Sequence, residues 1–191
     1  MKSVISIILL LLSIFLMYLL FLNIQEPIKF QKELETRESA VIDKLENVRK
    51  AQEFHKDITG RYAKTFDSLK YVLQTDSFSI IKVEGDPDDA SGEGFIKTII
   101  KRSAMDSIKA IGLDITDLAH IPFSDNGKFT IAADTLTYQS TLVNVTEVGT
   151  RYKSFMGPFA SKKYSKYDHS YNPDKLLKFG DMNTPNLSGN W

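Results

Sequence analysis

The run VISIILLLLSIFLMYLLFL occupies residues 4–22 and constrains how the whole chain can fold. Fifteen of its 19 residues are Val, Ile, Leu or Phe, and no charged residue interrupts it. A helix rises about 1.5 Å per residue, so this run covers roughly 30 Å, the thickness of the hydrocarbon core of a bilayer. The sequence therefore predicts a transmembrane helix, with Val4, Leu12 and Leu22 in the membrane anchor.

A cleavable secretory signal is the competing interpretation of the same run. Its apolar part normally has about 7–15 residues and precedes a cleavage site of small residues. The run here is longer, and residues 23–27 contain no Ala, Gly or Ser. The chain has no cysteine, which excludes a lipoprotein signal. We favour a single-pass anchor in the inner (cytoplasmic) membrane with the body facing the periplasm, although the Lys/Arg count on either side does not itself favour this orientation.

The composition of the remaining chain suits one domain with a hydrophobic core. The absence of cysteine removes disulfides, zinc–thiolate sites and thiol nucleophiles together. The formal net charge is zero, but residues 151–178 carry seven Lys or Arg against two Asp. We therefore expect the C-terminal part to be locally basic.

A second helical pattern follows the anchor, over about residues 29–58. Its apolar stripe is expected to pack within the body or against a partner through Leu34, Val41, Leu45 and Val48. Residues 31–39 are mostly charged, so the helix is expected to leave the membrane solvated. Pro27 predicts a kink or short break before it, and Gly60 predicts its end.

The downstream pattern changes from helices to strands. A short helix is expected from Phe66 to Gln74 with Thr65 as its N-cap, and another from Ser103 to Gly112. Asn126-Gly127 has the signature of a two-residue hairpin turn. Strands are expected at residues 78–83, 95–100, 129–133 and 141–148, and the only regular part of the tail at 175–179.

Helices first and strands afterward predict an α+β fold, in which the long N-terminal helix packs on a small antiparallel sheet. We divide the chain into a transmembrane anchor (1–26), an amphipathic helix with a stalk and a core-packing half (27–60), an α+β body (61–150), and a basic, aromatic tail with one last strand (151–191).

Three segments resemble type IV pilin-like and type II secretion pseudopilin-like proteins: VRKAQEFH (48–55), TGRYA (59–63) and FDSL (66–69). They are similar to the pilin-like succession of amphipathic helix, Gly-x-Tyr turn and short helix. The turn GDPDD (85–89) and the ending SGNW (188–191) also resemble a largely uncharacterised family of membrane-anchored envelope proteins. The resemblance implies a non-enzymatic subunit or accessory of a secretion, pilus or motility assembly, with protein partners or self-association.

The chain departs from polymerising pilins at two places. No glycine precedes Val4, and no acidic residue lies between Val4 and Leu22, whereas those pilins have a processing glycine and a glutamate inside the helix. The resemblance therefore extends to the shape, and not to the processing or the polymerisation.

Candidate chemistry is sparse. Asp86, Asp88 and Asp89 offer oxygen ligands for Ca²⁺, but their spacing is not that of a calcium loop, and acidic residues are common in turns. Asp168-His169-Ser170 contains the residue types of a hydrolytic triad, yet adjacent side chains do not adopt that geometry. The three histidines have no helical ligand spacing. We expect no catalytic residues, no metal site and no cofactor.

The tail is the most suggestive segment, because it alternates cations with aromatic residues. It predicts either a solvated loop whose tyrosines cover the sheet, or a surface that holds nucleic acid, anionic glycan or lipid headgroups. A membrane-tethered binding module for polyanions such as DNA or anionic glycan is therefore the alternative function. The residues expected to contact a polyanion are Arg151, Lys153, Lys162, Lys163, Lys166 and Tyr167.

Overall fold

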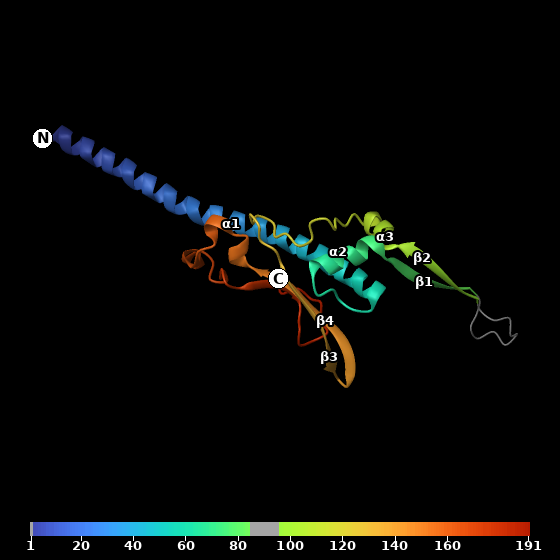
Figure 1. Ribbon diagram of the computed structural model, residues 1–191. Coiled ribbons are helices and arrows are strands. Elements are labelled where there is room, and N and C mark those ends of the chain that lie inside the picture. Colours follow the sequence, from blue (N-terminus) through green and yellow to red (C-terminus); the bar gives the residue numbers. More distant parts are fainter. Residues whose placement is uncertain (1, 85–95) are drawn as a thin grey trace.

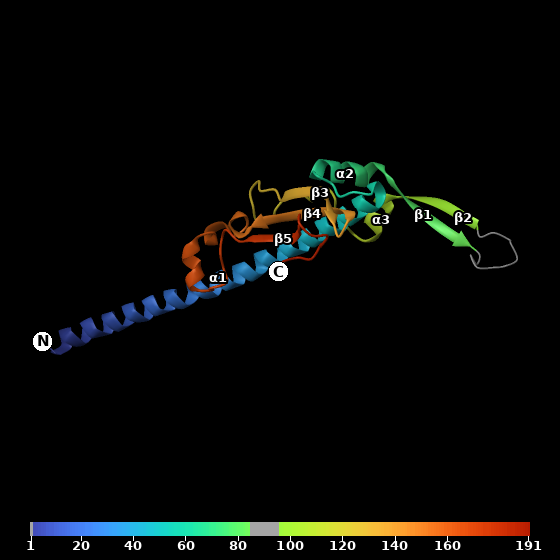
Figure 2. The same cartoon turned by 90° about the horizontal axis from the view of Figure 1, so that it is seen from below.

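A computed structural model describes residues 2–84 and 96–191. One long helix, α1 (Lys2–Thr59), carries a body made of two short helices, a two-stranded sheet, a three-stranded sheet and a C-terminal segment (Figure 1). All the described folded elements after α1 gather along its C-terminal part, while its N-terminal part extends away alone (Figure 2). The fold is therefore α+β, as predicted.

Helix α1 continues through Pro27 without interruption. The predicted break is wrong: proline costs the helix one hydrogen bond and a steric clash, but contacts of the tail with Glu26 and Phe30 hold the helix on both sides of it. The helix ends where predicted: Gly60 has φ of +77°, and its N–H donates to the carbonyl of Lys56 over 2.7 Å. This left-handed conformation is one that glycine adopts without steric cost.

The two halves of α1 meet different surroundings. The N-terminal half is long and apolar enough to cross a membrane, and its side chains lie uncovered by the rest of the protein. Val4 and Leu12 are exposed there, and Leu22 lies in the same helix. In the other half Val41, Leu45 and Val48 are completely buried, whereas Leu34 is only partly covered. Val41, Leu45 and Val48 therefore pack within the body.

Helix α2 (Phe66–Thr75) packs on α1 through the buried side chains of Leu69 and Leu73. The Thr65 hydroxyl caps it by accepting the N–H of Ser68 over 3.2 Å, as predicted. In the connection between α1 and α2, the buried side-chain amide of Gln52 forms hydrogen bonds with both backbone groups of Ala63. Its Nε2 donates to the Ala63 carbonyl over 3.0 Å, and its Oε1 accepts the Ala63 N–H over 2.8 Å.

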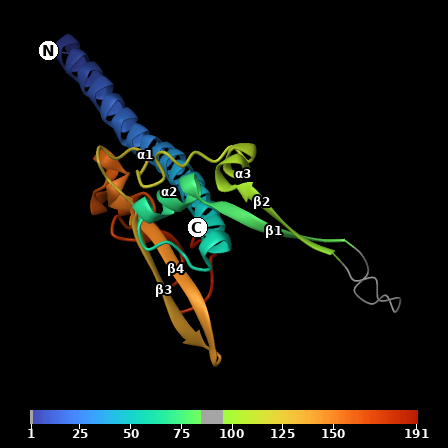
Figure 3. The ribbon, with the colours of Figure 1, turned by 45° about the vertical axis from the view of Figure 1, so that its right-hand side comes forward.

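Strands β1 (Ser77–Glu84) and β2 (Ile96–Ser103) form an antiparallel pair that projects beyond the end of α1 (Figure 3). The pair is closed at its base, where the N–H of Ala104 donates to the Asp76 carbonyl over 3.1 Å. Helix α3 (Ala104–Ala110) follows directly. Ser103 occupies the N-cap position as predicted, although its side chain makes no capping bond.

The larger sheet has the antiparallel order β3–β4–β5, from β3 (Thr130–Tyr138), β4 (Thr141–Arg151) and β5 (Leu176–Gly180). Val148, Leu177 and Phe179 are buried in the core that α1 shares with this sheet. Strands β3 and β4 are joined by the two-residue turn Gln139-Ser140, with φ of 47° and 67°.

The predicted two-residue turn at Asn126-Gly127 is wrong. These residues end a wider loop in which the Ile121 N–H donates to the Gly127 carbonyl over 2.9 Å, and the positive φ of 60° falls on Phe123. The geometry that Asn-Gly favours is formed instead by Gln139-Ser140, because the long β3–β4 pairing determines where the chain must reverse.

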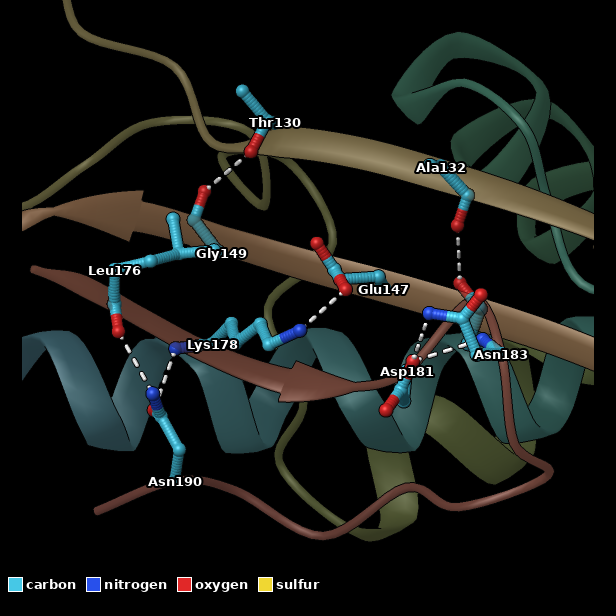
Figure 4. Close-up of polar contacts among 10 residues, drawn as sticks. Thr130, Ala132, Glu147, Gly149, Leu176, Lys178, Asp181, Asn183 and Asn190 are labelled. Atoms are coloured by element: carbon cyan, nitrogen blue, oxygen red, sulfur yellow. Dashed lines mark hydrogen bonds and ion pairs between the residues drawn. The ribbon is translucent and has the colours of Figure 1, made fainter.

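The C-terminal residues cover the outer edge of β5 (Figure 4). The Asn190 side chain donates to the Leu176 carbonyl over 2.7 Å and accepts the Lys178 N–H over 2.9 Å. On the other side, Lys178 Nζ lies 2.5 Å from the carboxylate of Glu147 on β4. An uncovered strand edge invites pairing with other chains, and these contacts close it.

We predict that Gln52→Met destabilises the body by about 2–4 kcal/mol, because it leaves both the N–H and the carbonyl of Ala63 buried without a partner. Chemical unfolding of the full chain in detergent micelles, followed by circular dichroism, measures this change. Gln74→Met is the matched control, because Gln74 is exposed near the end of α2. Equal stability of the two variants would contradict the assigned role of Gln52.

Candidate functional site

The basic C-terminal segment folds back onto α1 at the end of the body nearest the anchor (Figures 1 and 2). It contains three short 3-10 helices, η1 (Tyr152–Ser154), η2 (Gly157–Phe159) and η3 (Lys162–Lys166). On α1, the completely buried Phe30 contacts Phe159 of η2 and Tyr164 of η3, while Tyr152 of η1 contacts Glu38. The stalk predicted to be solvated is solvated on one face only: Lys32 and Glu35 are exposed, whereas Phe30 packs against the tail.

The contact is made by five rings, which we call the aromatic cluster: Phe30, Phe159, Tyr164, Tyr167 and Tyr171. The Tyr164 ring stacks on Phe30 with centroids 5.2 Å apart and 6° between planes. The Tyr171 ring meets Phe30 edge-on, at 5.0 Å and 77°. Such offset and edge-to-face pairs each add about 0.5–1.5 kcal/mol beyond the area they bury.

A polar group sits at the anchor-facing side of the aromatic cluster. The Tyr167 hydroxyl donates to Glu26 Oε2 over 2.5 Å, and the ammonium groups of Lys163 and Lys166 lie 3.8 and 3.9 Å from the same carboxylate. The carboxylate of Glu26 therefore has one hydrogen-bond donor and two positive charges around it, at the junction between the apolar run and the body.

A second polar group fixes the tail further along α1. The Tyr152 hydroxyl donates to Glu38 over 2.6 Å, and Arg37 Nη1 donates to the Phe155 carbonyl over 2.8 Å. Arg37 is oriented by Glu33, one turn earlier, through a 2.7 Å ion pair. Of the charged residues at positions 31–39, Arg37 and Glu38 therefore bind the tail, whereas Lys32 and Glu35 are exposed.

The structure divides the predicted polyanion contacts into two groups. Lys163, Lys166 and Tyr167 surround Glu26. The other group surrounds Asp174: Lys153 Nζ lies 2.8 Å from its carboxylate, and Arg151 donates to its carbonyl over 3.3 Å. The Lys153 bond lowers the pKa of Asp174 most, with smaller contributions from Arg151 and Lys162.

The aromatic rings of the tail tyrosines are covered by other parts of the protein. Tyr152, Tyr164 and Tyr171 are buried, and Tyr167 is partly covered by the aromatic cluster. A surface that stacks nucleobases needs exposed rings. The basic residues of the tail remain accessible, but the aromatic residues that alternate with them serve the packing on α1.

A hollow of about 370 Å³ opens beside the aromatic cluster. It lies between α1, which contributes Gln25, Glu26 and Lys29, and η2, which contributes Phe159. Pockets for small molecules have about 300–1,000 Å³, so this hollow has room for a ligand of modest size. Its position at the anchor-facing end distinguishes it from the other hollows along the described part of the body.

Sequence reasoning missed Glu26, Phe30, Arg37 and Glu38. The signal for Phe30 is its spacing of four residues before Leu34 and eleven before Val41, which continues the apolar stripe toward the anchor. No local signal identifies Glu26, because its partner Tyr167 lies 141 residues away in the sequence.

The remaining candidate residues form no shared site. Asp168 accepts both the N–H and the hydroxyl of Ser170, over 2.8 and 2.7 Å, which is a local turn, and His169 is exposed. Asp86, Asp88 and Asp89 lie outside the described residues. Within residues 2–84 and 96–191, no three His, Asp or Glu side chains gather as metal ligands.

Comparison of the chain with protein-family models, with curated proteins and with solved structures finds no match in any of the three.

We predict that Phe30→Ala loosens the tail, because it removes the ring on which four others pack. Loss of a buried phenylalanine costs about 3–5 kcal/mol. Trypsin cleavage after Lys163 and Lys166, followed over time by mass spectrometry of the full chain in micelles, should become faster. Ile28→Ala is the control, because Ile28 is exposed on the same stretch of α1. Equal cleavage rates of the two variants would show that the aromatic cluster does not hold the tail.

A second prediction concerns alkaline pH. Burial raises the pKa of Tyr171 to about 12, and burial together with the Glu38 carboxylate raises that of Tyr152. The unfolded side chains ionise near pH 10, so the stabilising contribution of both tyrosines is complete below pH 10. The contribution of Tyr171 is lost as the pH rises through about 12, and that of Tyr152 as the pH rises through its own raised pKa. Titration of tyrosinate absorbance should show a late component that shrinks in Tyr152→Phe and Tyr171→Phe. A late component unchanged in both variants would contradict this assignment.

Proposed function

We propose that this chain is a non-enzymatic, membrane-anchored envelope protein, a pilin-like or pseudopilin-like subunit or accessory of a secretion, pilus or motility assembly. The observation that carries the proposal is the unbroken helix α1, which contains both the apolar run and the packing stripe of the body. Its 58 residues correspond to about 87 Å of helix.

A continuous helix differs physically from a flexible tether. An enzyme that only needs to stay near a membrane is held well enough by a linker whose ends move freely. Here the body is fixed to α1 by the core, by the aromatic cluster and by the contacts of Glu26 and Glu38. Its height and orientation relative to the anchor are therefore set, which favours docking with neighbouring subunits or with a second copy.

The location that goes with this function is the inner membrane, with the body in the periplasm. Resistance to alkaline carbonate extraction tests the anchor, and protease protection on spheroplasts tests the orientation. A mature form without residues 4–22 that is released by carbonate would contradict the anchor, and a body resistant to protease on spheroplasts would invert the topology.

The alternative function, a tethered module for DNA or anionic glycan, has less support from the geometry. The tail tyrosines are engaged on α1, and the six predicted contact residues serve two different acidic partners. A nonspecific attraction by exposed lysines remains, and its strength would fall steeply with salt.

We predict that an amine-reactive cross-linker applied to native membranes yields discrete adducts of this chain with a second copy or with another envelope protein. Mass spectrometry identifies the adducts. Recovery of the monomer alone would contradict the proposal.

Two insertions between Ile24 and Gln25 test whether the rigid connection matters. A seven-residue helical insertion keeps the helical phase to within about 20° and shifts the body by about 10 Å, whereas a seven-residue Gly/Ser insertion releases it. We expect the Gly/Ser insertion to lower the yield of adducts more than the helical one. Equal yields would show that a tether suffices.

A further inference from the structure

We propose that the hollow beside the aromatic cluster binds the headgroup of an anionic phospholipid, with Lys163 and Lys166 as its charged partners. This inference goes beyond docking with proteins, and from the proposed function it needs only the claim that residues 4–22 cross a bilayer.

The first argument is depth. The headgroup layer adds about 5–8 Å to each side of a hydrocarbon core of about 30 Å. The apolar run ends at Leu22, and Glu26 lies four residues later, about 6 Å further along the helix. Because Lys163 and Lys166 are 3.8 and 3.9 Å from Glu26, their ammonium groups lie at the depth of the phosphates.

The second argument is the state of these lysines. An N–H···O hydrogen bond has a length of about 2.7–3.2 Å, so neither lysine spends a donor on Glu26 at the observed distances. Both side chains are more than half exposed, at 59% and 58%. Glu26 already accepts the shorter bond from the Tyr167 hydroxyl. Lys166 also forms a hydrogen bond with Tyr167, but an ammonium group has three N–H donors, so both lysines retain donors for a phosphate.

The third argument is preorganisation. Lys163 Nζ lies 4.5 Å from the centroid of the Tyr164 ring, and Lys166 Nζ lies 4.4 Å from that of Tyr167. These rings belong to the aromatic cluster, so the cations are held over a rigid support. Tyrosine and lysine are also the residues enriched where membrane proteins pass through the interface.

The fourth argument is the chemical character of the residues that line the hollow. The hollow is lined by Lys29 and by the Phe159 ring, so a cation and an apolar surface meet there. Glu26, the one carboxylate that lines the hollow, already has Lys163 and Lys166 beside it, and Lys29 lines the same hollow. An anionic headgroup beside the start of an acyl chain matches this combination better than a soluble polymer, because the lipids of the same bilayer are already present at this depth.

The test uses the full chain reconstituted in phosphatidylcholine vesicles with trace spin-labelled phosphatidylglycerol or spin-labelled phosphatidylcholine. Electron paramagnetic resonance of the motionally restricted fraction gives the relative association constant of the two lipids. We expect the wild type to prefer phosphatidylglycerol. Each lysine near an anionic surface contributes at most about fivefold, so Lys163→Gln/Lys166→Gln should lose up to about 25-fold of this preference.

Two further variants make the test specific. Lys50→Gln/Lys109→Gln removes the same charge from exposed lysines on distant parts of α1 and α3, and it should keep the preference. Lys163→Arg/Lys166→Arg retains the charge and should also keep the preference for phosphatidylglycerol. Raising the salt to about 0.5 M should reduce the preference of the wild type, because exposed charges are then screened within a few ångströms.

The outcomes separate this inference from the proposed function. A wild type that incorporates into vesicles and resists carbonate, but shows no preference or the same preference as Lys163→Gln/Lys166→Gln, overturns the lipid site and leaves the anchor intact. An equal loss in Lys50→Gln/Lys109→Gln also overturns it, since the effect would then reflect total charge. Release of the wild type by carbonate overturns the anchor, and with it both proposals.

Discussion

The packing of Phe30 among the rings of the tail extends the contact between the body and α1 toward the apolar run, beyond the core at Val41, Leu45 and Val48. Without it, the tail would lose the completely buried ring on which it folds. In the folded tail, Glu26 and Glu38 each accept a hydrogen bond from a tyrosine hydroxyl, and Arg37 donates one to a backbone carbonyl. The aromatic contact thus brings together polar partners that are more than a hundred residues apart.

The same helix has to satisfy two surroundings, and it changes from one to the other within a few residues. Up to Ile28 its large apolar side chains are uncovered, and at Phe30 they become buried by protein. Lys163 and Lys166 lie beside Glu26, between these two stretches of the helix, whereas Arg151 and Lys153 lie beside Asp174.

Local patterns predicted much of the fold and little of the site. The stripe of Val41, Leu45 and Val48, the Thr65 cap and most strands follow from spacing and turn chemistry within short windows. The turn at Gln139-Ser140 escaped prediction because strand pairing imposes its geometry on residues that do not favour it. The tail escaped because its structure depends on Phe30 and Glu26, far away in the sequence. The pilin-like resemblance stays a prediction.

The aromatic cluster lies where Pro27 weakens the helix against bending. Proline has no N–H, so the carbonyl of Asn23 lacks its helical partner, and the helix is weakest against bending at this point. The tail contacts Glu26 on one side of the proline and Phe30 on the other, and it therefore spans the weak point from outside. Residues 159–171 therefore contribute to the bending stiffness of α1 around Pro27, together with the helix itself. If this segment detached, the helix could bend at Pro27 and the body would change its orientation relative to the apolar run.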